Sequence, residues 1–336
     1  MSDKMNPAVD SPGSVPTALV ALDWGTSSLR AWRVSSAGQV LEERHRPWGI
    51  LHLPEGGFPA AYASITEGWQ GPPDVPVPVI ASGMVGSRQG WQEVPYLNLP
   101  LDLNQLAGSL TQVEGFGLRL VPGLLDETRD GHPDVLRGEE TEAVGALERL
   151  EDTAGEILLV MPGTHCKWVR VSNGVIAGFT TYMTGELFAL LKEHSILGRS
   201  IPTNAVTLPA DDPARRRAFD DGVLAAASDG LAGRLFSVRA LVLTGKLDAA
   251  LIADYLSGLL IGEELTRALA AARAGGAEPD RIVLVGDPAI TARYARAFAT
   301  LGRTVPTELG AASVRGLYRI AVLAGLVAAT AGESAC

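Results

Sequence analysis

Largely apolar runs that end at a glycine turn occur in both halves of the chain and predict the same local structure. Residues 18–23 form such a run before Gly25, and strand-like runs follow at 29–34 and 39–44. Runs at 157–161, 166–171 and 175–182 repeat this order around Gly163. Because short runs bounded by turn residues are typical of β-strands, we expect each half to begin with a three-stranded meander.

The two halves also share individual residues in the same order. In each copy the first run is followed by Gly-Thr, then by a cation and then by Arg-Val-Ser, and the spacing differs by one residue between the copies. The residues are Gly25, Thr26, Arg30 and 33–35 in the first copy, and Gly163, Thr164, Lys167 and 170–172 in the second. A shared order of this kind indicates internal duplication. The chain is therefore predicted to contain two related lobes.

Helical and further strand-like segments follow each meander. We predict strands at 77–81 and 283–285, helices at 138–150, 185–194, 248–272 and 290–301, and a buried or capping helix at 320–331. Strands alternating with helices behind a meander predict an α/β fold in each lobe. The expected division is a loose, disordered tail at 1–17, an N-terminal lobe at 18–153 and a C-terminal lobe at 154–336.

Composition and charge narrow the choice of partners and compartment. The formal net charge is −10 and the pI is near 5.1, so long-range electrostatics disfavour nucleic acid and anionic membranes. An anionic ligand would have to be bound locally, by backbone N–H groups and a few cations. With two cysteines, no apolar signal segment and no apolar stretch long enough to span a bilayer, we expect a cytoplasmic protein. Its oligomeric state stays open, with a homodimer among the options.

The first glycine turn combines residue types that bind phosphate. Gly25 lets the backbone approach an anion closely, and Thr26 and Ser27 offer hydroxyl and amide donors. Arg30 would neutralise phosphate charge, and Asp23 could hold Mg²⁺ through water. From this copy alone, an ordinary β-hairpin turn is an equally good interpretation.

The second copy favours phosphate binding. Gly163, Thr164 and His165 would supply the turn, and Lys167 the cation, whereas Cys166 is expected to be a packing residue. In two pseudo-symmetric lobes these turns can face each other across a cleft and hold a phosphate chain from opposite sides. The chain has no Walker A, Rossmann glycine, HExxH or GxSxG motif, which removes the commonest other nucleotide and hydrolase templates.

Several blocks resemble known families. Residues 23–30 (DWGTSSLR) resemble the first phosphate motif of the actin, hexokinase and Hsp70 superfamily. Five blocks resemble the 2-dehydro-3-deoxygalactonokinase family and run in family order: 81–87 (ASGMVGS), 94–97 (VPYL), 137–141 (RGEET), 161–169 (MPGTHCKWV) and 183–187 (MTGEL). The resemblance implies two duplicated RNase H-like lobes with an interlobe active-site cleft. It also implies transfer of a phosphoryl group from ATP, with Mg²⁺, to the C6 hydroxyl of 2-dehydro-3-deoxy-D-galactonate in galactonate catabolism.

Two glutamates at the start of the helix predicted at 138–150 are candidates for the catalytic base. The superfamily places its catalytic acid residue about there, so the resemblance implies Glu139 as the base and Glu140 as a close second. Only one can face the substrate, because adjacent helical side chains point about 100° apart. Many relatives have Asp at this point, so Mg²⁺ coordination with Asp23 is another role. On the residues alone, glutamates that complement the helix dipole are the simpler interpretation.

A small-residue loop and two arginines suit a sugar acid, because hydroxyls and amides can bind the sugar and a guanidinium its carboxylate. The candidates are Ser82, Gly83, Met84, Ser87, Arg88 and Arg137, and either arginine could pair with the carboxylate. In the superfamily the turn after the strand at 283–285 holds adenosine, so the resemblance places Gly286 and Thr291 there.

Two alternatives remain open from the sequence. A regulator that senses a sugar without turnover could keep this fold, although the N-terminal tail lacks the length and basic charge of a DNA-binding head. A kinase for another sugar or an anhydrosugar would share the phosphate motifs but should lack the specific central blocks.

Overall fold

The computed structural model describes residues 15–127, 131–201, 209, 211–274 and 279–328. The chain divides into two units. Among the described residues, unit 1 contains those within 15–94, 107–122 and 317–328, and unit 2 contains those within 95–106 and 123–316. Most of the tail predicted to be disordered, residues 1–14, lies outside the described residues.

Unit 1 is built on a six-stranded sheet that begins with the predicted meander. Its strand order is β3-β2-β1-β4-β7-β6. The strands are β1 (Leu19–Trp24), β2 (Leu29–Val34), β3 (Val40–Arg46), β4 (Val79–Ser82), β6 (Thr111–Gln112) and β7 (Leu118–Leu120). The first three pair antiparallel, whereas β4 runs parallel to β1 and β7 runs parallel to β4. The central strand β1 is almost fully buried, as expected for a strand covered on both faces.

Aromatic side chains fill the core on one face of this sheet. The helix α1 (Gly57–Ile65) contributes Phe58 and Tyr62, which pack with Trp24, Trp91 and Phe116. The rings of Phe58 and Trp91 stack with their centroids 5.8 Å apart. Trp91 therefore belongs to the packing of unit 1, in keeping with the apolar character of this region.

Unit 2 repeats the order of the first five strands of this sheet. Its order is β12-β11-β10-β13-β14, formed by β10 (Glu156–Met161), β11 (Cys166–Ser172), β12 (Val175–Tyr182), β13 (Arg281–Val285) and β14 (Thr307–Leu309). The first three pair antiparallel, and β13 and β14 continue parallel from β10. The register shifts between Arg33 and Val34 in one meander and between Arg170 and Val171 in the other, at the same point of the repeat. The shared order and the shared bulge confirm the predicted α/β duplication.

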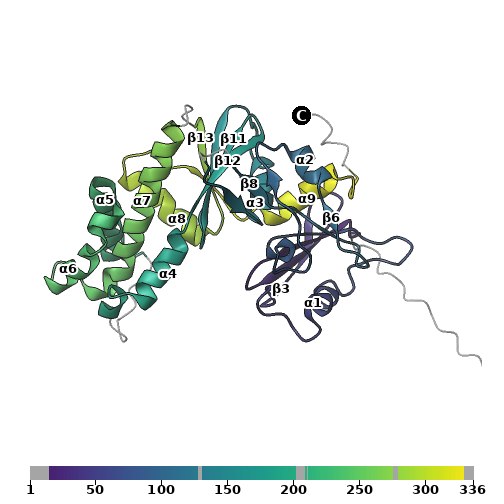
Figure 1. Ribbon diagram of the computed structural model, residues 1–336, viewed down its shortest axis with the longest axis horizontal. Coiled ribbons are helices and arrows are strands. Elements are labelled where there is room, and N and C mark those ends of the chain that lie inside the picture. Colours follow the sequence, from purple (N-terminus) through teal and green to yellow (C-terminus); the bar gives the residue numbers. More distant parts are fainter. Residues whose placement is uncertain (1–14, 128–130, 202–208, 210, 275–278, 329–336) are drawn as a thin grey trace, which may run out of the picture. The chain divides into compact units, whose positions relative to one another are not determined.

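Unit 2 also contains six α-helices in its described residues. They are α3 (Glu139–Leu147), α4 (Thr184–His194), α5 (Pro213–Arg234), α6 (Ser237–Leu243), α7 (Ile252–Ala274) and α8 (Pro288–Thr300). Of these, α5, α6 and α7 group together to one side of the sheet in Figure 1. The side chains of Asp212 and Asp287 cap α5 and α8, and a proline follows each cap, which is a favourable way to begin a helix. The helix α5, which was not predicted from the sequence, packs along α7 in Figure 1.

A small third sheet attaches to the meander of unit 2. It contains β5 (Leu97–Asn98), β8 (Leu124–Asp126) and β9 (Asp134–Leu136). The Phe179 N–H of β12 donates to Asp126 (2.8 Å), and the Thr181 N–H donates to Asp134 (2.7 Å). These bonds explain why residues 123–153 group with unit 2 in the structure. The lobe boundary at residue 153 stays a prediction.

Two short helices lie where the units divide the chain. The helix α2 (Leu103–Gly108) and the helix α9 (Ser313–Leu323) each contain residues of both units. In the described part of the chain, no helix is both long and apolar enough to cross a membrane.

Candidate active site

In unit 1 the predicted phosphate turn, residues 25–28, joins β1 to β2. The Gly25 N–H donates to the Ser28 carbonyl (2.9 Å), and Thr26 and Ser27 are exposed. Beside this turn the Arg30 guanidinium pairs with the Asp23 carboxylate at 2.6 Å. Both side chains keep partial solvent exposure, so the pair can still meet a ligand. We call residues 25–28 the first phosphate turn.

The predicted sugar loop lies next to this turn. Ser82 at the end of β4 is the register partner of Asp23. Gly83 has a φ of +94°, and a Cβ placed there would lie 2.8 Å from the Trp24 carbonyl oxygen, so only glycine fits without displacement. The buried Ser87 hydroxyl has no hydrogen-bond partner among the described residues, whereas Arg88 is exposed and Met84 is half-buried.

In unit 2 the corresponding turn, residues 163–165, joins β10 to β11, and we call it the second phosphate turn. Thr164 and His165 are exposed, and the His165 ring is 2.5 Å from the Glu186 carboxylate. The Glu186 N–H also donates to the Thr164 carbonyl (3.0 Å). Glu186 was not among the predicted site residues, although it belongs to the block at 183–187 that resembles the kinase family.

Behind the second phosphate turn lies a buried ion pair. The Lys167 ammonium is 3.2 Å from the Glu139 carboxylate, and the side chains are 5% and 27% exposed. Lys167 also donates to the His165 carbonyl (3.4 Å). The structure thus brings together the predicted cation of the turn and the first of the two predicted carboxylates.

Glu140 differs from Glu139 in its surroundings. It is fully buried, and the Gly138 N–H donates to its Oε2 (2.5 Å), whereas its Oε1 has no hydrogen-bond partner among the described residues. Burial raises the pKa of the Glu140 carboxyl to about 8, and the negative charge of Glu139 adds to this effect. Glu140 is therefore largely protonated at neutral pH.

Arg137 lies directly before these glutamates. Its backbone N–H donates to Glu139 Oε2 (3.1 Å), and its guanidinium stacks 4.4 Å from the centre of the Tyr96 ring. Tyr96 is part of the block at 94–97, so the structure joins two of the blocks that carried the resemblance.

The turn predicted to hold adenosine follows β13. Gly286 has a φ of +140°, which favours glycine, and its N–H donates to the Leu309 carbonyl (3.1 Å). A Cβ at Gly286 would lie 3.8 Å from the Pro162 carbonyl, so this turn adjoins the second phosphate turn. Thr291 is 1% exposed and its hydroxyl donates to Glu308 (2.6 Å), which leaves its side chain occupied within the protein.

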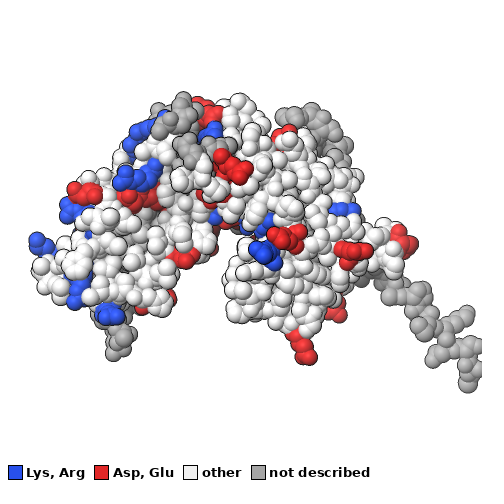
Figure 2. All heavy atoms as spheres, in the orientation of Figure 1, with Lys and Arg blue, Asp and Glu red and all other residues white. Residues whose placement is uncertain are grey.

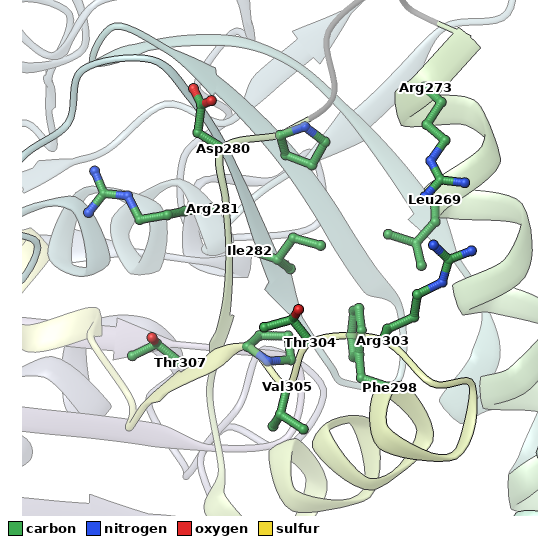
Figure 3. Close-up of a pocket in the computed structure, with 12 residues that line it drawn as sticks. Leu269, Arg273, Asp280, Arg281, Ile282, Phe298, Arg303, Thr304, Val305 and Thr307 are labelled. Carbon is green, nitrogen blue, oxygen red and sulfur yellow. The ribbon is translucent and has the colours of Figure 1, made fainter.

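A pocket of about 390 Å³ lies elsewhere in unit 2, at the amino end of β13 (Figure 3). Arg273, Arg281 and Arg303 line it together with Leu269 and Phe298. In Figure 2, basic side chains are visible over the end of unit 2 where Figure 1 labels α7 and β13. None of the predicted site residues lines this pocket, and Gly286 follows the opposite end of β13.

The described residues contain no group of three or more His, Cys, Asp or Glu side chains arranged to hold a metal. The Asp23 carboxylate is partly exposed at the end of β1, where it pairs with Arg30. Each phosphate turn is described within its own unit, so the clamp formed by both turns stays a prediction.

Comparison with known proteins decides the family. The profile of the 2-keto-3-deoxy-galactonokinase family matches residues 23–320. The chain belongs to this family. It is 37% identical over 292 residues to the 2-dehydro-3-deoxygalactonokinase of Escherichia coli (strain K12), covering 87% of this chain and 92% of that protein. It is 39% identical over 291 residues to a Rhizobium meliloti (strain 1021) relative assigned the same activity, covering 85% and 90%.

A solved structure supports the same grouping. The chain is similar to a Sinorhizobium meliloti protein assigned as a 2-dehydro-3-deoxygalactonokinase, with a TM-score of 0.80 and 37% identity over 90% of this chain and 98% of that one. The family and fold predicted from the sequence blocks are thereby confirmed.

Proposed function

We propose that this protein transfers the γ-phosphoryl group of ATP to the C6 hydroxyl of 2-dehydro-3-deoxy-D-galactonate, in galactonate catabolism. The hydroxyl oxygen bonds to the γ-phosphorus, the bond from that phosphorus to the β-γ bridging oxygen breaks, and ADP leaves. The observation that carries this proposal is the ion pair of the buried Lys167 with the partly exposed Glu139 behind the exposed second phosphate turn. Phosphoryl transfer needs this combination of a cation for the phosphate and a carboxylate for the hydroxyl.

Each phosphate turn would bind ATP through backbone N–H groups and hydroxyls. In unit 2 these come from Gly163, Thr164 and His165, with Lys167 as the cation. In unit 1 they come from Gly25, Thr26 and Ser27, with Arg30 as the cation. The exposure of Thr26, Ser27, Thr164 and His165 supports this assignment.

Glu139 is the carboxylate that we assign as the base. Its side chain is 27% exposed, whereas Glu140 is fully buried and its oxygens are closed to a substrate in this structure. Glu139 would accept the proton from the attacking hydroxyl, and the neighbouring Lys167 would hold the phosphoryl group. Glu140 would support the start of α3 through its bond from the Gly138 N–H.

Asp23 would hold Mg²⁺ through water, with Arg30 beside it. When bound, Mg²⁺ neutralises phosphate charge and orients the triphosphate. We assign the substrate to Ser82, Gly83, Met84, Ser87, Arg88 and Arg137, and adenosine to the turn at Gly286. Thr291 would support this turn from the first residues of α8, because its buried hydroxyl is bonded to Glu308. The unpaired hydroxyl of Ser87 supports the first assignment. Location in the cytoplasm, with ATP and a sugar acid as partners and neither nucleic acid nor membrane, belongs to the same proposal.

A coupled assay of ADP release tests the proposal with a panel of sugar acids and neutral sugars. We expect turnover with 2-dehydro-3-deoxy-D-galactonate that greatly exceeds turnover with any other compound. The Glu139→Gln variant should lose at least about 100-fold in kcat, because a positioned base contributes roughly that factor. Preferred turnover of a neutral sugar would refute the substrate assignment, and ligand binding without turnover of any compound would indicate a sensor.

A further inference from the structure

A buried carboxylate in unit 2 has no role in the site described above. Glu264 on α7 is only 2% exposed, yet three donors converge on it. The Trp168 indole donates at 2.7 Å and the Tyr294 hydroxyl at 2.7 Å, and the Thr184 hydroxyl donates to the same carboxylate oxygen as Tyr294. Burial raises the pKa of Glu264, and the three hydrogen bonds partly oppose this effect. A helix position between Leu260 and Ala268, both buried, would ordinarily carry an apolar residue.

A first chain of contacts connects Glu264 with the second phosphate turn through α4. Thr184 begins that helix, and Gly185 and Glu186 follow it. A Cβ at Gly185 would lie 2.3 Å from the Gly163 carbonyl oxygen, so the helix start is in direct backbone contact with the turn. The Glu186 N–H then donates to the Thr164 carbonyl (3.0 Å).

A second chain of contacts connects Glu264 with the same turn through Tyr294 and Cys166 of β11. The hydroxyl of Tyr294, which donates to Glu264, is 3.0 Å from the Cys166 sulfur. Because the Tyr294 proton is used for Glu264, the Tyr294 oxygen can accept from the Cys166 thiol, which also has the Gly163 carbonyl oxygen of the turn as an acceptor at 3.3 Å. The Gly163 N–H in turn donates to the Cys166 sulfur at 3.5 Å. Burial raises the pKa of the Cys166 thiol to about 11, so the thiol keeps the proton that this arrangement requires.

We propose that Glu264 is a positioning residue that fixes the second phosphate turn for the nucleotide, acting through Thr184 on one side and through Tyr294 and Cys166 on the other. This inference rests on the proposed function, in which residues 163–165 bind the phosphates of ATP. It also gives a role to the block at 183–187, because Thr184 carries the hydrogen bond and Gly185 permits the contact. A carboxylate is required at position 264, since it alone accepts from all three donors at once.

The Glu264→Gln variant tests this proposal. A glutamine must place its NH₂ group toward some of the donors, so at least one hydrogen bond is lost or reversed. We expect ADP affinity, measured by calorimetry, to fall about tenfold, as for the loss of one charge-assisted hydrogen bond. The KM for ATP should rise in parallel, whereas the KM for the sugar acid should change less than about twofold. The matched control is Glu263→Gln on the same helix, whose side chain pairs with Arg267 instead and should leave ADP affinity unchanged.

A purely structural role would give a different pattern. It would lower the melting temperature or the active fraction, and the remaining folded protein would bind ADP with wild-type affinity, which would overturn the proposal. If Glu264→Gln does not fold, the pair Thr184→Val and Thr184→Ser replaces it. The valine lacks the hydroxyl and should weaken ADP binding about fivefold, whereas serine keeps it and should restore binding. Equal affinity in the two variants would also overturn the proposal.

The calorimetric readout separates this proposal from the proposed function. If the wild-type protein binds ADP but phosphorylates no sugar acid, the assigned activity is refuted while the effect of Glu264→Gln on ADP binding still decides the positioning role. If the wild-type protein binds no nucleotide, both proposals fail.

Discussion

The two phosphate turns have the same position in duplicated sheets but are held in place differently. Each turn packs against a segment that follows the third strand of its meander, which we call its backing segment. A glycine of that segment makes close contact with the turn. A Cβ at Gly49 would lie 2.1 Å from the Thr26 carbonyl oxygen, and one at Gly185 would lie 2.3 Å from the Gly163 carbonyl oxygen. The first backing segment is a loop, whose Ile50 N–H donates to the Gly25 carbonyl (3.1 Å), and the second is the start of α4.

The polar anchors and cations of the two turns also differ. The first backing segment is tied to the core by the Trp24 indole, which donates to the Trp48 carbonyl (2.8 Å), whereas the second is tied by the carboxylate of Glu264. Arg30 pairs with Asp23 from its own meander, but the equivalent of Asp23 is Met161, and Lys167 pairs with Glu139 of α3 instead. Duplication therefore preserved the backbone frame, while the ion pairs and hydrogen bonds of the side chains around each turn diverged.

The largest effect that this comparison predicts concerns the two cations. Lys167→Met should reduce kcat/KM about 1,000-fold, because it removes the buried cation that we propose for the transferred phosphate and leaves Glu139 without its partner. Arg30→Met should cost about 30-fold, since Arg30 is more exposed and already shared with Asp23. Steady-state kinetics at saturating Mg²⁺ measure both.

Lys192→Met serves as the control for these variants, because Lys192 lies on α4 beside Phe188 and away from the turn. An equal loss of kcat/KM in the two variants, or a larger loss in Arg30→Met, would contradict the prediction that Lys167 contributes more to catalysis than Arg30.

The backing glycines give the next largest effect. Gly49→Ala and Gly185→Ala should each reduce kcat/KM about 100-fold, because a methyl group in either place displaces the turn backbone by several tenths of an ångström or more. Gly233→Ala on α5 has open space around its Cβ position and should be neutral. A variant with wild-type kinetics at either glycine would show that its turn tolerates displacement and does not position the phosphates.

The free energy of unfolding should depend on pH through the buried carboxyl of Glu140 in unit 2. The pKa of Glu140 in unit 2 is about 8 in the folded protein, compared with an ordinary value of 4.5. Between these values the folded state binds more protons than the unfolded state, so the free energy of unfolding falls as pH rises from about 4.5 through 8. The loss is on the order of a few kcal/mol.

Glu140→Gln removes this titration. Its melting temperature should be close to that of the wild type near pH 5 and higher than that of the wild type above pH 8, as calorimetric scans across this range would measure. Parallel curves for the two proteins would contradict the burial of an ionisable carboxyl at α3. If Glu140 were the base, the variant would also lose the activity that Glu139→Gln is expected to lose.

The smallest effect concerns substrate recognition in unit 1. Arg88→Ala should raise the KM for the sugar acid about tenfold and leave the KM for a neutral sugar analogue unchanged, if Arg88 pairs with the carboxylate. Arg137→Ala in unit 2 is the comparison variant, since Arg137 stacks on Tyr96. Unchanged KM values for the acid in the first variant and raised values in the second would assign the carboxylate to Arg137.

Local patterns in the sequence predicted most of the sheet framework. The strands at 29–34 and 175–182 match β2 and β12 residue for residue, and the other meander strands agree within two residues at each end. Apolar runs and the turn residues that bound them are local signals, so they can be recognised without knowing the fold. The helix α5 was missed because its many charged and alanine residues give only a weak apolar stripe, and its partner α7 supplies the burial.

The sequence by itself determined the duplication, the two glycine turns, the family and the pairing of a cation with each turn, because these follow from residue order and short-range geometry. Only the tertiary structure showed that Lys167 pairs with Glu139, that Glu140 is closed off while Glu139 is not, and that Glu264, 80 residues beyond Thr184, lies beneath the second phosphate turn. Such contacts join residues far apart in the chain, and the charge, burial and hydrogen bonding of a side chain depend on neighbours that residue order does not specify.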